Sequence, residues 1–436
     1  MMNLLKFSFG NSQIAIKYMT VARKNSSYDV LKIRDYRHYI LARTLVSISI
    51  TIMATIVGWQ VYAYTHDVLS LGLIGLSEFV PAFIVGLAGG YIADKFDRKK
   101  IIMTCIFFLA ISAFSLFLLS TKLEFLIKNY GVVFIYCVVG FTGLIRGFLS
   151  PANTAFGSQL IPKELFSQAA TFTTMSWQVA NIGGPAIGGI IYAVTKEAWP
   201  SYLLVMMCEF SGLFLASTIA SRHITVEKSD ASEKEDFWAS IQTGLKFVFK
   251  HQIILGAISL DMFAVLFGGA VAMLPAFAKD ILILGPEGLG IMRAAPAIGA
   301  LLMAWILTQY PIKKNTGKML LFAVAGFGIC TIFFAVSTNF WLSLLMLAGT
   351  GFFDTVSMVI RGTIIQLYTP NEMRGRVSAV NALFIGSSNE LGGFESGVAA
   401  RFMGLVPSVI FGGVMTLVVV ATAWFAAPKL KNLNEM

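Results

Sequence analysis

The chain has 436 residues, of which 56% are hydrophobic and only 13% are charged, and its mean hydropathy is +0.75. A soluble domain carries about 25% charged residues, so this composition excludes a water-soluble fold of this size and indicates a protein that lies in a lipid bilayer. The formal net charge of +10 is concentrated in particular loops and does not indicate a nucleic-acid partner.

Residues 1–40 are polar and basic, unlike the apolar remainder of the chain. No short apolar region with a small-residue cleavage site comes after them, so residues 1–40 are expected to form a cytoplasmic tail and not a targeting segment. A helix needs about 20 mostly apolar residues to cross a bilayer. Six such runs come next, at about 41–64, 71–93, 101–120, 132–156, 167–194 and 200–220. Residues 41–220 are therefore expected to form an N-terminal six-helix bundle.

A polar stretch, residues 221–252, separates this bundle from the rest of the chain. It begins with a solvated mixed-charge segment and ends with apolar residues at helical spacing, namely Phe237, Ile241, Leu245 and Val248. Ser232 and Glu235 precede them at the spacing of a capping box. The pattern predicts a linker with an amphipathic helix that lies at the cytoplasmic interface and tethers the two bundles.

Six further apolar runs complete the chain, at about 253–278, 288–309, 318–337, 341–366, 376–400 and 407–427. They predict a C-terminal six-helix bundle over 253–427 and a cytoplasmic tail over 428–436. Only helices or closed barrels satisfy their backbone groups in lipid, and runs of this length exclude barrel strands. The predicted fold class is therefore an all-α membrane protein with twelve transmembrane helices in two six-helix bundles.

The distribution of basic residues predicts the orientation. With both termini inside, 25 of the 33 Lys and Arg residues lie on the cytoplasmic side. Only five lie outside, namely Lys122, Lys128, Lys196, Lys279 and Arg401. This asymmetry explains the net charge as an insertion signal and predicts a multi-pass protein of the cell inner (plasma) membrane with no nucleic-acid partner.

An internal repeat relates the two predicted bundles. Shifting the chain by 208 residues aligns residues 161–169 with 369–377, and it places Gly189 on Gly397. The same shift pairs Asn181 with Asn389 and Arg146 with Asp354. A period of half the chain indicates duplication of a six-helix unit, with pseudo-symmetric halves and the substrate between them near the midplane.

The loop between the second and third spans reads GGYIADKFDRKK (89–100) and resembles the signature loop of the major facilitator superfamily. The residues that carry the resemblance are Gly90, Asp94, Arg98 and Lys99. Asp97 stands where the general pattern has Gly. The resemblance implies that this loop latches the cytoplasmic ends of the two halves when the outer side is open. Asp94 at a helix end can meet the positive N-terminus of a neighbouring helix, such as the span that begins near Arg376.

The fifth span contains ANIGGPAIGGI (180–190), which resembles the antiporter motif of the same superfamily. Its matching residues are Gly184, Pro185, Gly188 and Gly189. Proline removes a backbone donor and glycines permit close helix approach, so this segment is suited to bending and to helix contact. Ordinary small-residue packing is the alternative interpretation. The motif favours export by antiport.

Nearly the whole chain resembles the enterobactin-exporter-like branch of the superfamily, which is also similar to macrolide and other drug efflux proteins. The stretches that carry this resemblance are LKIRDYRHYILAR (31–43), RGFLSPANTAF (146–156), LKFVFKHQIILGAI (245–258) and TPNEMRGRVSAVNALF (369–384). The resemblance implies that the first, fourth, seventh and tenth helices line the cavity.

Charged groups inside the spans are costly and usually functional. Desolvation favours the neutral form of a carboxyl group, which suits reversible proton uptake during transport. The candidates for proton coupling are Asp261, Glu78, Glu395 and Asp354. Each could instead be held by an arginine or a backbone group, and a pairing of Arg146 with Asp354 across the halves is one such possibility.

Aromatic, amide and guanidinium side chains on these helices are candidates for substrate binding. They are Arg146, Trp177, Gln178, Asn181, Phe263, Arg361 and Asn389. Ordinary helix packing is the alternative for each of them.

No residue pattern indicates an enzyme, a metal site or a cofactor. The chain has no GxxxxGK[ST] loop, its four histidines are scattered, and its four cysteines lie inside apolar segments. The leading hypothesis is a monomeric, proton-driven exporter of a small organic molecule, either a siderophore or an amphipathic drug. The alternative is a facilitator or importer of lysophospholipid or another organic anion, for which Arg146, Arg293 and Arg361 would be the anion contacts.

Overall fold

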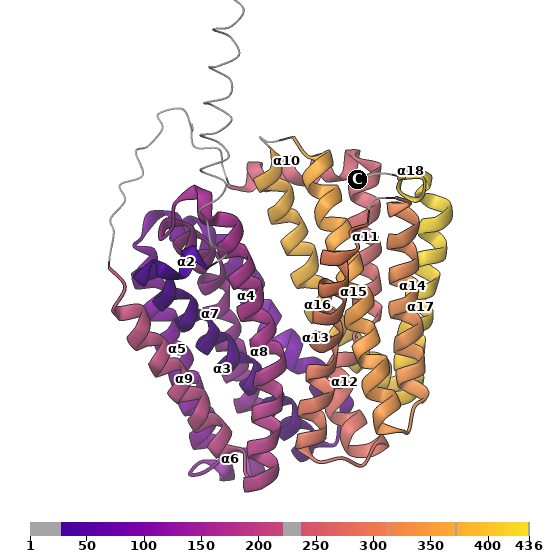
Figure 1. Ribbon diagram of the computed structural model, residues 1–436. Helices are drawn as coiled ribbons and strands as arrows, with labels where there is room; N and C mark the ends of the chain where they lie inside the picture. Colours follow the sequence, from indigo (N-terminus) through magenta and orange to yellow (C-terminus); the bar gives the residue numbers. More distant parts are fainter. Residues whose placement is uncertain (1–27, 221–236, 313, 371–372, 435–436) are drawn as a thin grey trace, which may run out of the picture.

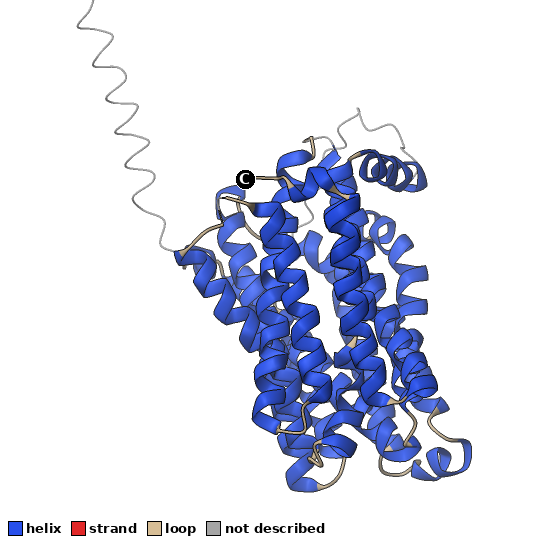
Figure 2. Cartoon of the chain, turned by 90° about the vertical axis from the view of Figure 1, so that its right-hand side faces the viewer, coloured by secondary structure: helices blue, strands red, loops and turns tan. Residues whose placement is uncertain are grey.

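The computed structural model describes residues 28–220, 237–312, 314–370 and 373–434. Over these ranges the chain consists of helices joined by short loops, with no strand (Figure 2). An N-terminal and a C-terminal half lie side by side (Figure 1). We call the end of the molecule that carries α2, α10 and α18 the termini end, and the end that carries α6 the opposite end. Most of the expected N-terminal tail, together with Ser232 and Glu235, lies outside the described residues.

The N-terminal half contains six long helices. They are α3 (Arg34–Thr65), α4 (Val68–Lys95), α5 (Arg98–Leu119), α7 (Val133–Gln159), α8 (Phe166–Thr195) and α9 (Trp199–Ser217). Three short elements accompany them, namely α2 (Asp29–Lys32), α6 (Glu124–Tyr130) and η1 (Lys163–Leu165).

The C-terminal half repeats this arrangement. Its long elements are α11 (Gln252–Phe267) with α12 (Ala270–Ala276) and η2 (Phe277–Ile281), then α13 (Pro286–Gln309), α14 (Thr316–Val336), α15 (Phe340–Tyr368), α16 (Arg374–Met403) and α17 (Leu405–Ala426). Two short helices, α10 (Phe237–Lys250) and α18 (Pro428–Lys431), lie at the termini end. Each predicted span corresponds to one of the long elements in the two halves, which confirms the all-α fold.

Ten of the described elements are long and apolar enough to cross a membrane by themselves. The two other long helices are α8 and α16, which occupy the fifth position of their halves. Both pack against the other half, α8 against α13 and α16 against α4. Because a helix between the halves meets protein more than lipid, it can carry polar residues such as Asn181, Asn389 and Glu390 without exposing them to hydrocarbon. Their lower hydropathy therefore reflects their place in the fold.

The seventh span is not the continuous helix that its hydropathy predicts. Helix α11 ends at Phe267, and Gly268 and Gly269 separate it from α12. A methyl group on Gly269 would lie 2.6 Å from the carbonyl oxygen of Gly392 on α16. The break therefore occurs where α16 approaches too closely for any side chain, and the span is completed by α12 and the π-helical turn η2.

The repeat does not keep a single offset along the chain. Helices α8 and α16, which begin at Phe166 and Arg374, keep the shift that aligns the sequence, whereas α4 and α13, which begin at Val68 and Pro286, are further apart in the chain. The difference arises between the third and fourth helices of each half. The connection there spans residues 120–132 and contains α6 in the first half, but only residues 337–339 in the second. The shift found in the sequence therefore relates only the fourth, fifth and sixth helices of the halves.

The linker helix α10 packs on the termini end of α16. Val248 is fully buried, and a methyl group on Gly244 would lie 3.0 Å from the backbone oxygen of Arg376. The side chains of Phe237 and Ile241 are outside the described part of the chain. Helix α10 is thus fixed to the C-terminal half, next to the start of the helix that crosses to the N-terminal half.

Candidate functional site

Two glycine crossings join the halves towards the opposite end. On one side, a methyl group on Gly189 of α8 would lie 2.5 Å from the carbonyl oxygen of Pro286 and 3.1 Å from the Cα atom of Gly290 on α13. On the other side, a methyl group on Gly397 of α16 would lie 2.9 Å from the Cα atom of Gly72 on α4. Gly72 and Gly290 occupy equivalent positions in α4 and α13, as Gly189 and Gly397 do in α8 and α16, so the crossings are repeat mates. Glycine is required because the backbones touch.

The other residues of the antiporter-like motif pack within the N-terminal half. A methyl group on Gly184 would overlap the Thr51 hydroxyl of α3, and one on Gly188 would lie 3.2 Å from the Ile52 side chain. The carbonyl oxygen of Pro185 faces Gly290 of the other half, 2.5 Å from where a methyl group on that glycine would lie. The motif thus places α8 against α3 with one set of residues and against α13 with another.

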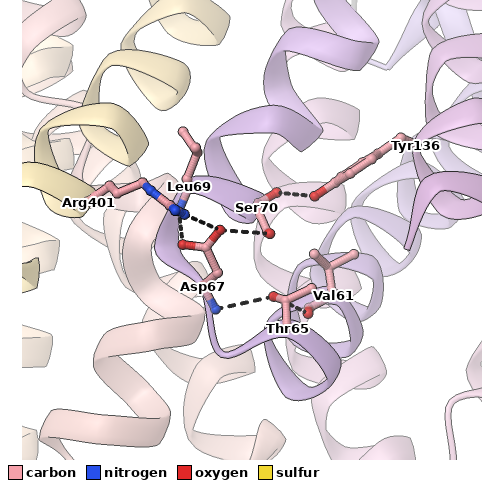
Figure 3. A network of polar contacts seen from close by, with 7 residues as sticks. All are labelled: Val61, Thr65, Asp67, Leu69, Ser70, Tyr136 and Arg401. Carbon is pink, nitrogen blue, oxygen red and sulfur yellow. Dashed lines mark hydrogen bonds and ion pairs between the residues drawn. The ribbon is translucent and has the colours of Figure 1, made fainter. Parts of the chain in front are cut away.

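Polar contacts close the same end of the molecule. Arg401 of α16 donates a hydrogen bond of 3.0 Å to Asp67, which lies between α3 and α4 in the other half (Figure 3). The backbone N–H of Leu69 and the hydroxyl of Ser70 also donate to Asp67, both at 3.3 Å. Tyr62 of α3 donates to Asp280 of η2, again between the halves. Towards the termini end, the two halves diverge (Figure 1).

Arg146 forms an ion pair with Glu78 inside the N-terminal half. Arg146 lies near the middle of α7, and Glu78 lies on the adjacent helix α4. The possible pairing of Arg146 with Asp354 is therefore wrong in this structure, because Glu78 is nearer and belongs to the helix that packs most closely on α7. The side chains are partly accessible, with exposed fractions of 35% for Arg146 and 18% for Glu78.

Arg361 forms a second ion pair, with Asp261, inside the C-terminal half. These side chains are only 6% and 7% exposed, and the Ser357 hydroxyl donates to Asp261 at 3.3 Å. Asp354 lies one turn along α15 from Ser357 and lines a small cavity together with Asp261, Phe327 and Phe353. Two candidate coupling carboxylates therefore line the same small pocket.

Glu390 lies in the site although it is not among the candidates for proton coupling. It is on α16, and its carboxylate would be 3.4 Å from a methyl group on Gly75 of α4, one turn from the glycine crossing at Gly72. Its charge also interacts with that of Arg146 in the other half. Nothing in the sequence indicates this interaction, because Glu390 comes near Arg146 only through the packing of α16 on α4. Glu395 is half-buried further along α16.

The remaining substrate candidates do not form a hydrogen-bonded cluster among the described residues. Trp177 and Phe263 are 53% and 40% exposed, and Gln178 and Asn181 are partly buried on α8. Asn389 is exposed, and its amide donates to the backbone oxygen of Ile385 on its own helix at 2.9 Å. These side chains are partly or largely exposed, and no contact among the described residues holds them in a common geometry.

The side chains of Gly90–Lys95 in the signature-like loop are outside the described part of the chain. Asp97 caps α5 by accepting a hydrogen bond of 2.9 Å from the Lys99 N–H. This cap stabilises the start of the helix, although Asp97 stands where the general pattern of the loop has glycine. The Lys99 ammonium donates to the backbone oxygens of Ser217 and Ile219 at 2.8 and 2.6 Å. Arg98 donates to the Ala155 oxygen at 3.4 Å. The basic residues thus bind carbonyl groups of their own half.

No group of three or more His, Cys, Asp or Glu residues in the described ranges is placed to hold a metal ion. The chemistry that the site offers is the making and breaking of ion pairs inside the membrane. A carboxylate that binds a proton no longer attracts its arginine, so the strength of such an ion pair depends on the protonation of its carboxyl group.

Known proteins of similar sequence and structure are transporters. The profile of the family described as transmembrane secretion effector matches residues 25–436. An enterobactin exporter EntS of Shigella dysenteriae serotype 1 is 23% identical over 401 residues, which cover 89% of this chain and 93% of that protein. The enterobactin exporter EntS of Salmonella choleraesuis is 23% identical over 394 residues, covering 88% and 92%.

Solved structures of low sequence identity share the fold. A bacterial homologue of the human lysosomal transporter Spinster, 13% identical, aligns with a TM-score of 0.68 over 91% of this chain and 95% of that chain. A D-xylose–proton symporter, 14% identical, aligns with a TM-score of 0.68 over 90% and 98%.

Proposed function

Since the chain belongs to the transmembrane secretion effector family of major facilitator transporters, we propose that it exports a small organic molecule by proton antiport with alternating access. The cargo that we propose is a siderophore, with an amphipathic drug as the second choice. The similarity to enterobactin exporters over most of both chains supports a siderophore. The protein would act as a monomer in the inner membrane, with both chain ends in the cytoplasm.

The observation that carries this proposal is the position of the Arg146–Glu78 pair. It lies inside a membrane-spanning bundle and is partly accessible, and Arg146 also interacts electrostatically with Glu390 of the other half. Protonation of Glu78 would release Arg146, and Arg146 could then strengthen its interaction with Glu390 across the halves. A proton would in this way change the attraction between the halves, as antiport requires.

The orientation proposed from the basic residues would place the closed end of this conformation at the outer side of the membrane. The glycine crossings and the Asp67–Arg401 and Tyr62–Asp280 contacts would seal the outer side. The halves would then diverge towards the cytoplasm, from which an exporter takes its cargo. The reverse state requires these contacts to separate, because the backbones at the crossings touch and cannot slide past each other.

Transport into inverted membrane vesicles tests the proposal. With an acidic interior, vesicles that contain the protein should accumulate radiolabelled enterobactin about tenfold over vesicles that lack it. Nigericin, which collapses the pH gradient, should abolish the accumulation. Accumulation that persists in nigericin would exclude proton antiport, and equilibration without accumulation would favour a facilitator.

A further inference from the structure

Three arginines lie inside the spans and away from their ends, and one of them differs from the other two in its contacts. Arg146 and Arg361 form ion pairs with Glu78 and Asp261. Arg293 of α13 forms no ion pair or hydrogen bond with any described residue, and its Nε atom is buried without a partner. A guanidinium inside a membrane protein is costly unless an anion or hydrogen-bond acceptors compensate its charge. Arg293 therefore lacks the compensation that the other two arginines have.

Arg293 lies between the two halves. It follows Gly290 by three residues on α13, so it is one helical turn from the crossing with Gly189. Its terminal nitrogen lies 3.3 Å from where a methyl group on Gly58 of α3 would be, and Pro275 of α12 approaches the same point. The guanidinium thus lies against the other half at a glycine that leaves room beside it.

Arg293 is on the termini side of the crossing, and its side chain retains partial exposure. Arg293 is thus next to the crossing, on the side towards which the two halves diverge (Figure 1). Two neighbours of its guanidinium, Gly58 of α3 and Pro275 of α12, have no side-chain group that could accept a hydrogen bond. A single unpaired cation in such surroundings is the typical anchor of an anionic ligand.

We propose that Arg293 binds an anionic oxygen group of the cargo, a carboxylate or a deprotonated phenol, between the two halves. The inference rests on the proposed function, since it specifies the charge of the exported molecule. The site is completed only by residues of both halves, Arg293 from one and the backbone at Gly58 from the other. Binding of the anion is thereby linked to the rocking of the halves, because separation of α3 from α13 opens one wall of the site.

Two xanthene dyes of similar size and opposite charge, fluorescein and rhodamine 123, provide a direct test. Their binding to the purified full-length protein in a non-ionic detergent is measured by fluorescence polarisation. The wild type should bind fluorescein at least tenfold more tightly than rhodamine 123. Arg293→Gln should reduce fluorescein affinity about tenfold without weakening rhodamine 123 binding, and Arg293→Lys should restore most of the loss. Arg37→Gln, which removes the same charge at an exposed position of α3, is the matched control and should bind as the wild type does.

A second measurement on the wild type keeps the test valid if Arg293→Gln does not fold. Salicylate should displace bound fluorescein, whereas salicylamide, which differs from it only in the neutral amide, should displace at least tenfold less. Equal displacement by the two compounds would overturn the proposal, as would wild-type affinity for fluorescein in a monodisperse Arg293→Gln. These results are independent of the proton gradient. If the protein prefers the anionic dye but shows no vesicle transport driven by the pH gradient, only the proton antiport proposal fails. If it shows that transport but no preference for the anionic dye, only the proposal for Arg293 fails.

Discussion

Each half contains six long helical segments that pack in a similar way, but the charged side chains inside the two halves differ in how accessible they are. In the C-terminal half, Arg361 and Asp261 are almost completely buried and also have Ser357 as a neighbour. In the N-terminal half, Arg146 and Glu78 are several-fold more accessible, and Arg146 also interacts with Glu390 of the other half. A pair that is buried this deeply within one half stabilises its own bundle. A more accessible pair whose arginine also interacts with a third charge is the better candidate for a change of partners during transport.

The comparison predicts the largest loss of stability when the deeply buried Arg361–Asp261 pair is broken. Arg361→Gln leaves the Asp261 carboxylate buried without a cation, so the protein should lose about 3–5 kcal/mol of stability. Thermal unfolding in detergent and the monodisperse fraction after purification measure this loss. The double variant Asp261→Asn/Arg361→Gln should recover part of it, since no uncompensated charge remains. A single variant with the unfolding temperature of the wild type would contradict the assignment of this pair as structural.

The accessible pair should instead affect transport. Glu78→Gln removes the carboxyl group that is proposed to exchange a proton, so accumulation driven by the pH gradient should fall at least tenfold while the unfolding temperature changes by only a few degrees. Uptake into inverted vesicles and thermal unfolding give the two values. Glu164→Gln, an exposed change in η1, is the matched control. Accumulation by Glu78→Gln at the wild-type level would exclude this carboxylate from proton coupling.

The glycine crossings test whether the halves are equivalent where they meet. Gly189→Leu and Gly397→Leu each place a side chain against the backbone of the other half, so both should separate α8 or α16 from its partner. Spin labels at positions 197 and 283, on a cysteine-free background, should then report longer distances across the opposite end.

Two glycines on the same helices provide the controls. Gly183 of α8 and Gly386 of α16 have open space around the position of an added methyl group. Gly183→Leu and Gly386→Leu should therefore leave the distances unchanged. Similar lengthening in all four variants would show that bulk anywhere on these helices, and not at the crossings, controls the separation.

The smallest effect is expected at the surface. Asp67 and Arg401 are 33% and 56% exposed in their side chains, and exposed pairs contribute about 0.2–1 kcal/mol. Asp67→Asn should therefore shift the spin-label distance distribution by less than either crossing variant. Because salt screens exposed charges, the difference from the wild type should also disappear at about 1 M salt. A shift that is independent of salt would indicate that Asp67 acts through Leu69 and Ser70, its neighbours in its own half.

The sequence by itself predicted the all-α membrane fold, the order of its long helical segments and an internal repeat that relates the later helices of the two halves. These depend on hydropathy over about 20 consecutive residues and on similarity along the chain, and both are local properties. The sequence also singled out every member of the two ion pairs, because a charged residue inside an apolar span is conspicuous. The roles of Glu78, Asp261, Glu395 and Asp354 in proton coupling stay predictions.

The tertiary structure alone decided which residues are partners. Arg146 pairs with Glu78 and not with Asp354, and Gly189 meets Gly290, a residue of the other half. Such pairings depend on the rotation and tilt of helices that are distant in sequence, and hydropathy carries no information about either. The break at Gly268 and Gly269 has the same origin, because the approach of α16 requires it. Lipid selects which segments become helices, whereas close packing between them selects which side chains meet.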